Sequence, residues 1–229
     1  MSASNSSLPR YEIKFIAESF EYRRVLNWLR QHHSCLQLEY PDRQVNNIYF
    51  DSHTHHSFCE NIIGSSSKSK VRLRWYGASK NPVNSSLEIK CKRNQLNWKL
   101  IYKIQGELGA EGWNWKRVFS EIHRQLPLDA KEWLEMSPQP VLINRYVRKY
   151  FLSRDKKVRV TLDRDLDIYD QSRKSFPNYS LKSNLPKVLV LEVKFPKELR
   201  DYVVHAFGDI PLRGSRFSKY VSGFLSINN

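Results

Sequence analysis

The sequence predicts an α+β fold: a closed eight-stranded antiparallel β-barrel with a charged lumen, and amphipathic helices that cover its outside. Three observations lead to this prediction. Segments in which apolar and polar residues alternate dominate the chain, helical periodicity occurs in only a few places, and the polar positions of the strands are mostly charged. The chain has 229 residues, of which 40% are apolar, and this suits one sizeable domain with its own core.

Eight segments alternate with period 2 and are expected to be strands: residues 11–16, 45–51, 70–76, 87–92, 98–104, 145–151, 157–163 and 188–195. Loops rich in Gly, Ser, Asn or Pro separate several of them, at residues 64–67, 81–84 and 174–186. No linker divides the chain, so residues 10–229 are expected to form one domain. Residues 1–9 are rich in Ser and are expected to be a disordered tail.

Three segments have the spacing of amphipathic helices. One of them, residues 196–207, begins with a proline and is followed by Gly208, which suits a helix start and stop. The other two are recognised by apolar residues at helical spacing, which are Tyr22, Val25, Leu26 and Leu29 in the first and Trp115, Phe119, Ile122 and Leu126 in the second. Helices with a single apolar stripe need a sheet face to pack against.

Several strands carry cations at every second position. Arg72 and Arg74 share one face of their strand, and Lys90 and Lys92 share a face of theirs, so like charges are neighbours. An anion between them would explain such a repulsive arrangement. The opposite faces are bulky and apolar, as at Trp75, and the helices can cover them. The charged faces are therefore expected to line the interior of a closed barrel, which also leaves no sheet edge exposed.

The net charge limits the class of partner. Lys and Arg number 38 against 23 Asp and Glu, which gives +15 and favours an anionic partner. Neither common Gly-rich phosphate cradle is present, so a phosphate site has to be built from side chains. Duplex nucleic acid would not fit inside a barrel of about eight strands, and no nucleic-acid partner is expected. A basic lumen with a few carboxylates suits a polyanion together with a divalent cation.

The sequence favours a cytoplasmic protein. Its three cysteines, Cys35, Cys59 and Cys91, are widely spaced and include no C-x-x-C, which fits a reducing compartment. No apolar run approaches the ~18 residues of a membrane helix, so no membrane anchor is expected in this chain. The first residues also have no apolar segment of the kind that is typical of a signal peptide.

Eight short motifs, in order along residues 10–224, resemble one known family. They are E-I-K-F at 12–15, N-I-Y-F-D at 47–51, K-V-R-L-R-W-Y at 70–76, L-E-I-K at 87–90, Y-V-R at 146–148, R-V-T-L-D at 159–163, L-E-V-K at 191–194 and F-S-K-Y at 217–220. Their order and spacing are similar to the catalytic domain of the vacuolar transporter chaperone (VTC). This is the branch of the triphosphate tunnel metalloenzyme superfamily that makes inorganic polyphosphate from ATP, and it implies an eight-stranded tunnel.

The resemblance also implies roles for individual residues. The cations that would contact triphosphate or polyphosphate are Lys14, Arg72, Arg74, Lys90, Arg148, Arg159, Lys194 and Lys219. Tyr146 and Ser218 would donate hydrogen bonds to the phosphates, and further basic groups would be Arg216 and one of Lys99 and Lys103. Glu192 would hold Mn²⁺ or Mg²⁺, helped by Glu12.

The leading hypothesis is an ATP-dependent polyphosphate polymerase whose ligands are ATP, triphosphate and inorganic polyphosphate. One alternative is a hydrolase of the same fold that cleaves tripolyphosphate or a nucleoside triphosphate. Another is a non-catalytic binder of polyphosphate or nucleotides, and a surface nucleic-acid binder is a more distant one. Arg10 stands where hydrolases of the superfamily have the first glutamate of E-x-E-x-K, which disfavours a second metal site and efficient hydrolysis.

Overall fold

One antiparallel sheet organises the described part of the chain, which is residues 10–94, 96–110, 114–172 and 174–228 of this computed structural model. Its strands are β1 (Tyr11–Glu18), β2 (Gln37–Asp51), β3 (Ser67–Tyr76), β4 (Val83–Arg93), β5 (Leu96–Glu107), β6 (Gln139–Leu152), β7 (Arg159–Asp170), β8 (Val188–Phe195) and β9 (Arg213–Gly214). In space the order is β5-β4-β3-β2-β6-β7-β8-β1-β9. The tail expected at residues 1–9 lies outside the described residues.

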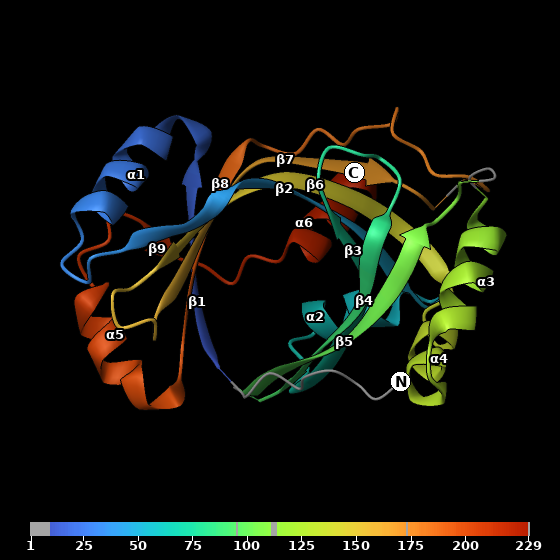
Figure 1. Cartoon of the computed structure of the whole chain (residues 1–229), viewed down its shortest axis with the longest axis horizontal. Coiled ribbons are helices and arrows are strands. Elements are labelled where there is room, and N and C mark those ends of the chain that lie inside the picture. Colours follow the sequence, from blue (N-terminus) through green and yellow to red (C-terminus); the bar gives the residue numbers. More distant parts are fainter. Residues whose placement is uncertain (1–9, 95, 111–113, 173, 229) are drawn as a thin grey trace.

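The sheet is an open arch, and the prediction of a closed eight-stranded barrel is wrong (Figure 1). Among the described strands, β5 pairs only with β4, and the two-residue β9 pairs only with β1, so these two form the edges. A side-chain ion pair spans the gap, because the Lys90 ammonium lies 3.4 Å from a carboxylate oxygen of Glu12. Hairpins are encoded by local sequence, whereas closure depends on whether two distant strands meet in register.

Two pairs of helices cover the convex face of the arch (Figure 1), and the sequence predicts three of these four helices but not the one at Leu128–Glu135. The helices α1 (Tyr22–Gln31) and α5 (Arg200–Ala206) lie over β1, β7 and β8, and each follows a short 3₁₀ turn. The helices α3 (Trp115–Gln125) and α4 (Leu128–Glu135) lie over β3, β4 and β5. Full burial of a Leu or Val side chain contributes about 1.5–3 kcal/mol, so the two convex cores hold the arch in shape.

Two helices that the sequence analysis does not predict, α2 (His56–Ile62) and α6 (Lys219–Asn228), lie beneath the arch (Figure 1). The second one packs on β6 and β7 through Tyr220, Leu142 and Ile168. A Cβ atom at Gly223 would lie 2.7 Å from Cδ1 of Ile168, so this close approach of helix to sheet requires glycine. No helix in the described ranges is long and apolar enough to cross a membrane.

Asp51, the last residue of β2, ties these two helices together. Its carboxylate accepts hydrogen bonds from the backbone amides of Ser57 and Phe58 in the first turn of α2, at 2.9 and 3.1 Å. It also accepts a hydrogen bond from the hydroxyl of Tyr220 in α6. The start of α6, with Lys219, is thereby fixed on the concave side of the sheet.

Candidate functional site

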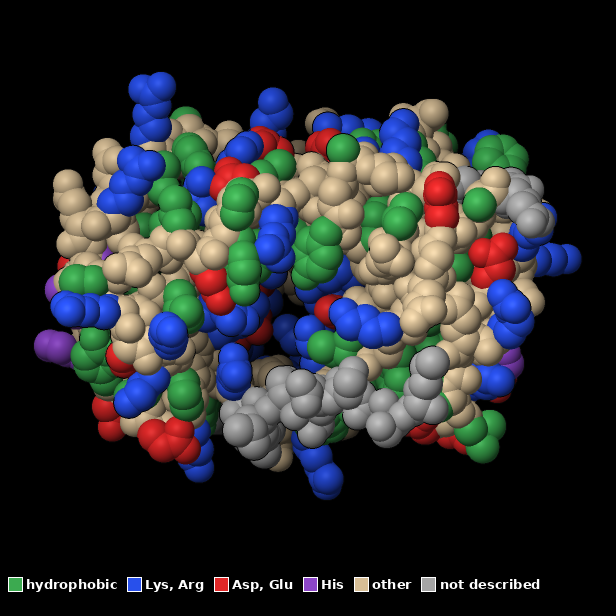
Figure 2. Space-filling view, viewed as in Figure 1, with side chains coloured by type: hydrophobic (Ala, Val, Ile, Leu, Met, Phe, Trp, Pro, Cys, Tyr) green, Lys and Arg blue, Asp and Glu red, His purple; other side chains and the backbone are tan. Residues whose placement is uncertain are grey.

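The charged and apolar residues of the strands lie on opposite faces of the sheet, as the sequence predicts. Leu73 and Trp75 of β3 are fully buried against α3 and α4. Arg72 and Arg74, which alternate with them, point to the concave face, where Arg72 lies opposite Glu88 of β4. Figure 2 shows a hollow near the middle of the molecule, with Lys and Arg side chains gathered around it. The concave face of the arch is therefore basic.

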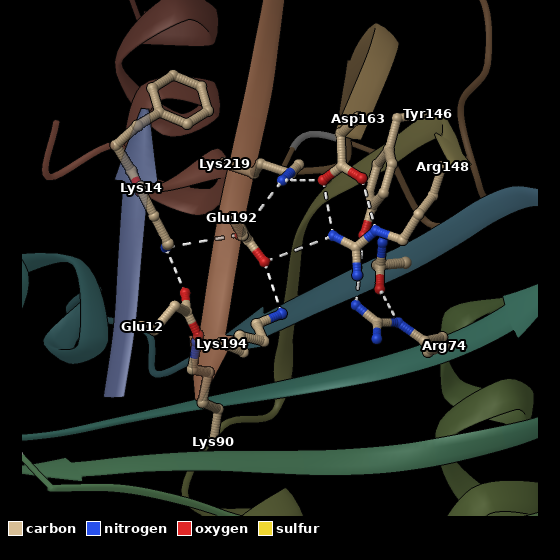
Figure 3. Close-up of polar contacts among 12 residues, drawn as sticks. Glu12, Lys14, Arg74, Lys90, Tyr146, Arg148, Asp163, Glu192, Lys194 and Lys219 are labelled. Atoms are coloured by element: carbon tan, nitrogen blue, oxygen red, sulfur yellow. Dashed lines mark hydrogen bonds and ion pairs between the residues drawn. The ribbon is translucent and has the colours of Figure 1, made fainter. Parts of the chain in front are cut away.

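Nine cations and four carboxylates of the described residues meet on this face, and we call them the charged cluster (Figure 3). They come from seven of the strands and from α6. The cations are Lys14, Lys70, Arg72, Arg74, Lys90, Lys99, Arg148, Lys194 and Lys219, and the carboxylates are Glu12, Glu88, Asp163 and Glu192. The surplus of positive charge can be neutralised by an anionic ligand.

Arg148 of β6 and Asp163 of β7 form the centre of the cluster (Figure 3). Nε and Nη2 of Arg148 donate to the two carboxylate oxygens of Asp163 at 2.5 and 2.6 Å, and Nζ of Lys219 lies 2.6 Å from one of them. Burial alone would raise the pKa of Asp163, but Arg148 and Lys219 hold it below its ordinary value. The Tyr146 ring supports both cations, with its centroid 5.2 Å from the Arg148 guanidinium and 4.8 Å from Nζ of Lys219.

Glu192 of β8 and Glu12 of β1 lie on adjacent strands, with the Lys14 ammonium between them (Figure 3). Nζ of Lys14 is 3.1 Å from Glu12 and 3.8 Å from Glu192, and Nζ of Lys194 donates to Glu192 at 2.7 Å. Burial and the Glu192 charge would raise the pKa of Glu12, but Lys90, Lys194 and Lys14 lower it to about 2. The pKa of Glu192 is also well below its ordinary value, because nearby cations outweigh its burial. Both carboxylates are therefore ionised at neutral pH.

Arg72 and Arg74 share the buried carboxylate of Glu88. Nε and Nη2 of Arg72 donate to it at 2.8 and 2.5 Å, and Nη1 of Arg74 lies 3.4 Å away. Lys99 of β5 reaches the second oxygen of Glu88 at 3.1 Å. Arg74 is also held by Asn47, whose side-chain oxygen accepts a hydrogen bond from Nε at 2.8 Å. The repulsion between the two arginines, which the sequence analysis assigned to a bound anion, is thus relieved by the protein's own carboxylate.

Lys70 is the cation of the cluster that the sequence analysis did not select, although it continues the row of Arg72 and Arg74 at period 2. Its Nζ donates to Oγ of Ser218 at 3.0 Å, and no carboxylate among the described residues pairs with it. Burial, followed by the surrounding positive charge, lowers the pKa of Lys70 to about 7. The cations that contribute are Lys90, Lys14, Lys68 and Arg72. An anion bound on the concave face would supply the counter-charge that Lys70 lacks.

We expect the contribution of Lys70 to tripolyphosphate binding to decrease as the pH rises from about 6 to about 9. Because the pKa of Lys70 is about 7, its ammonium is mostly charged at the lower pH and mostly neutral at the higher one. A bound anion favours the charged form, so binding above pH 7 has to take up a proton, which makes it less favourable. Calorimetry measures the association constants of the wild type and of Lys70→Met. The ratio of the first to the second should fall over this range.

The ligand's own titration is common to both proteins and cancels in that ratio. A matched control is Lys116→Met, an exposed lysine of α3 on the convex side, for which the corresponding ratio should stay near one. A Lys70→Met ratio that does not change with pH would contradict the role of this lysine.

Three of the predicted cations lie outside the charged cluster, whereas Tyr146 and Ser218 contact its members. Arg159 of β7 pairs with Glu39 at 3.4 Å, and its side chain is 42% exposed. Lys103 and Arg216 are exposed, and within the described ranges neither forms an ion pair. Their contacts with phosphate stay predictions, as do the roles of the cations inside the cluster.

Comparison with known protein families identifies the family of this chain. A family model of the VTC domain matches residues 9–228, which is almost the whole chain. The chain belongs to the VTC domain family. This confirms the family that the eight sequence motifs indicate. No curated protein matches the sequence of this VTC domain.

Solved structures of low sequence identity share the fold of this VTC domain. A putative adenylyl cyclase from Hippeastrum, described as having a dominant triphosphatase activity, has a TM-score of 0.54 and 15% identity, with 95% of each chain covered. A putative adenylate cyclase from Vibrio parahaemolyticus has a TM-score of 0.51 and 12% identity, over 93% of this chain and 97% of that one. A protein from Pyrococcus horikoshii OT3 has a TM-score of 0.50 and 12% identity, over 96% and 99%.

Proposed function

We propose that this VTC domain is a metal-dependent phosphotransferase that makes inorganic polyphosphate by transferring the γ-phosphoryl group of ATP to a growing chain. The observation that supports it best is the excess of nine cations over four carboxylates on one concave face of the described structure. Such an excess favours a multiply charged anion. Arginine forks bind phosphate oxygens in pairs, and lysines supply point charges, so both residue types suit phosphates.

The layout of the cations suits an extended row of phosphates better than a single one. Lys70, Arg72 and Arg74 follow one another at every second position of β3, and each step along a strand face is about 6.6 Å. The row therefore spans about 13 Å, which is beyond the reach of one phosphate group. Lys14 of β1 and Lys194 of β8 approach from the other side of the arch (Figure 3). A triphosphate or a longer chain can contact both sides at once.

The transfer step needs charge stabilisation more than covalent chemistry. The bond between the γ-phosphorus and the oxygen that links it to ADP breaks, and a bond to a terminal oxygen of the polyphosphate chain forms. ADP leaves with the linking oxygen, so no covalent enzyme intermediate is required. Arg148 and Lys219 are held in place by Asp163 and stabilise the charge on the transferred group without having to reorganise.

Glu192 and Glu12 are the residues that would hold Mn²⁺ or Mg²⁺. Hard divalent cations are commonly bound by one or two carboxylates together with phosphate oxygens and water. Two ionised carboxylates on either side of Lys14 fit this pattern. The described residues contain no group of three or more His, Cys, Asp or Glu side chains that could hold a metal, so phosphate oxygens would complete the shell. When bound, the ion would act as a Lewis acid that neutralises phosphate charge.

A hydrolase is the second candidate function. It is favoured by the fold shared with the Hippeastrum protein, which is described as a triphosphatase. In that case water would replace the polyphosphate chain as the acceptor, and orthophosphate would be the product. A surface nucleic-acid binder fits less well, because the cations of the cluster lie on the concave face beneath the helices and strands and not on an outer surface.

Analysis of the products formed from ATP separates the two enzymes. The purified domain is incubated with ATP and Mn²⁺, and in parallel with Mg²⁺, and the phosphate products are resolved by length. We expect polyphosphate and ADP, with one ADP released for each phosphate added to the polymer. Orthophosphate without polymer would favour the hydrolase, and tight binding of tripolyphosphate without any product would contradict both enzymes.

A further inference from the structure

A group of aromatic residues and one arginine continues the concave face beyond the charged cluster. Tyr76 follows Arg72 and Arg74 at the next period-2 position of β3, and Tyr150 follows Arg148 at the next one of β6. Each of the two tyrosines, Tyr76 and Tyr150, shifts the pKa of the other, so their hydroxyls lie near each other. The row of cations on each of these two strands therefore ends in an aromatic ring.

Tyr40 and Arg43, on the intervening strand β2, complete this group. The Tyr40 and Tyr150 rings meet edge to face, with centroids 5.6 Å apart and planes at 90°. The Arg43 guanidinium lies 4.0 Å from the Tyr40 centroid and 5.7 Å from that of Tyr150. No ion pair neutralises Arg43 in the part of the chain that the structure describes. We call Tyr40, Arg43, Tyr76 and Tyr150 the aromatic platform.

The platform is accessible, and it is continuous with the charged cluster. Tyr40 is 39% exposed and Tyr76 is 48% exposed, so large parts of both rings have no protein neighbour. The Arg148 guanidinium lies 5.9 Å from the centroid of Tyr150, which links the platform to the centre of the cluster. One step along a strand face, about 6.6 Å, separates the last arginine of each row from its tyrosine.

We propose that the aromatic platform binds the base of a nucleoside triphosphate whose phosphates lie on the charged cluster. This inference rests on the proposed function and names the nucleoside subsite of the same site. The tyrosine rings of the platform do not attract a phosphate chain, because the faces of aromatic rings carry negative potential. A base has a flat surface that stacks on Tyr and on Arg guanidinium planes. Arg43 also places an unneutralised charge next to the phosphate closest to the sugar.

The chemistry of the platform also defines its selectivity. Stacking depends on the area of the ring and hardly on its hydrogen-bonding edge, since every base has a stacking face. The platform is therefore expected to accept adenine and guanine equally well. It also distinguishes the donor from the product, because inorganic polyphosphate has no flat group that can stack on the tyrosine rings.

Calorimetry with two ligands tests the platform. We measure the affinities for ATP and for inorganic tripolyphosphate in the wild type, Tyr40→Ala, Tyr40→Phe and Arg43→Gln. Tyr40→Ala should weaken ATP binding about tenfold, as expected for loss of a ring that stacks on a base, and change tripolyphosphate binding less than about twofold. Tyr40→Phe keeps the ring and should bind ATP like the wild type. Arg43→Gln should weaken ATP binding more than tripolyphosphate binding, which provides a second variant if Tyr40→Ala does not fold.

The matched control is Tyr202→Ala, which removes a tyrosine of α5 on the convex side that is 48% exposed and should change neither affinity. Equal losses for both ligands in Tyr40→Ala, or no loss for either, would overturn the platform while leaving the proposed function intact. Absence of binding of both ligands to the wild type would contradict the proposed function and the platform with it. Unfolding midpoints of all variants establish that each one is folded.

Discussion

Replacing Arg148 with methionine should lower the free energy of unfolding by about 3–5 kcal/mol and abolish most of the binding of tripolyphosphate. The variant leaves the buried Asp163 carboxylate without its bidentate partner, and removing one member of a buried ion pair has costs of this size. The same change removes the cation that stands between Tyr146 and Glu192. Thermal unfolding and calorimetry of the same preparations measure the two effects.

The double variant Arg148→Met with Asp163→Leu separates stability from binding. The double variant no longer contains the buried Asp163 carboxylate, and Lys219 keeps Glu192 at 3.8 Å as its counter-charge. Stability should therefore return to within about 1–2 kcal/mol of the wild type. Binding should not return, because the cation is still missing. If tripolyphosphate binds normally to the double variant, Arg148 is structural and contributes nothing to the site.

Replacing Glu192 with glutamine should reduce Mn²⁺-dependent turnover by at least about 100-fold, because a metal that neutralises phosphate charge contributes several kcal/mol to the transition state. An amide is a far poorer ligand for a hard cation than a carboxylate. Binding of tripolyphosphate without metal should survive or tighten, since one carboxylate no longer repels the phosphates. Product assays and calorimetry with and without Mn²⁺ measure both effects.

Glu198→Gln is the matched control for this variant, because Glu198 is exposed and lies only six residues further along the chain. It should leave turnover and binding unchanged. Undiminished Mn²⁺-dependent turnover in Glu192→Gln would exclude this residue as the metal ligand and transfer the role to Glu12 or Glu88. A loss of binding with and without metal would instead indicate that Glu192 serves to position its four neighbouring cations.

The sequence predicts most of the fold because strand and helix periodicity are local. The convex helices α1, α3 and α5 begin and end close to the expected residues, and Gly208 follows the last of them. The expected strand at residues 45–51 is the second half of β2, which starts at Gln37, because bulges between Leu38 and Arg43 interrupt the period-2 pattern. The helix α6 is not predicted from the sequence, because its contacts are with distant strands and its sequence has no clear apolar stripe.

The residues of the candidate site can be predicted where charged and apolar residues alternate along a strand. All cluster cations except Lys70 were named from the sequence, and Lys70 obeys the same period-2 rule as the arginines beside it. The pairing of Arg148 with Asp163 and of Glu88 with Arg72 was not predictable, because it depends on which strands are neighbours and in which register. The closed barrel was wrong for the same reason. Nothing local in β5 or β9 shows whether the two edges of the sheet will join.

The open edge of the arch affects how a long polymer reaches the charged cluster. Among the described strands no backbone ladder joins β5 to β1 or β9, and the Lys90–Glu12 ion pair that spans the gap is partly exposed. A pair of this kind contributes about 0–1 kcal/mol, and parting the described edges would break no backbone ladder. For the polymer substrate that we propose, a chain of many phosphates could then be laid in from the side and lifted out the same way. The free end of such a chain would then not have to be threaded through a closed tunnel.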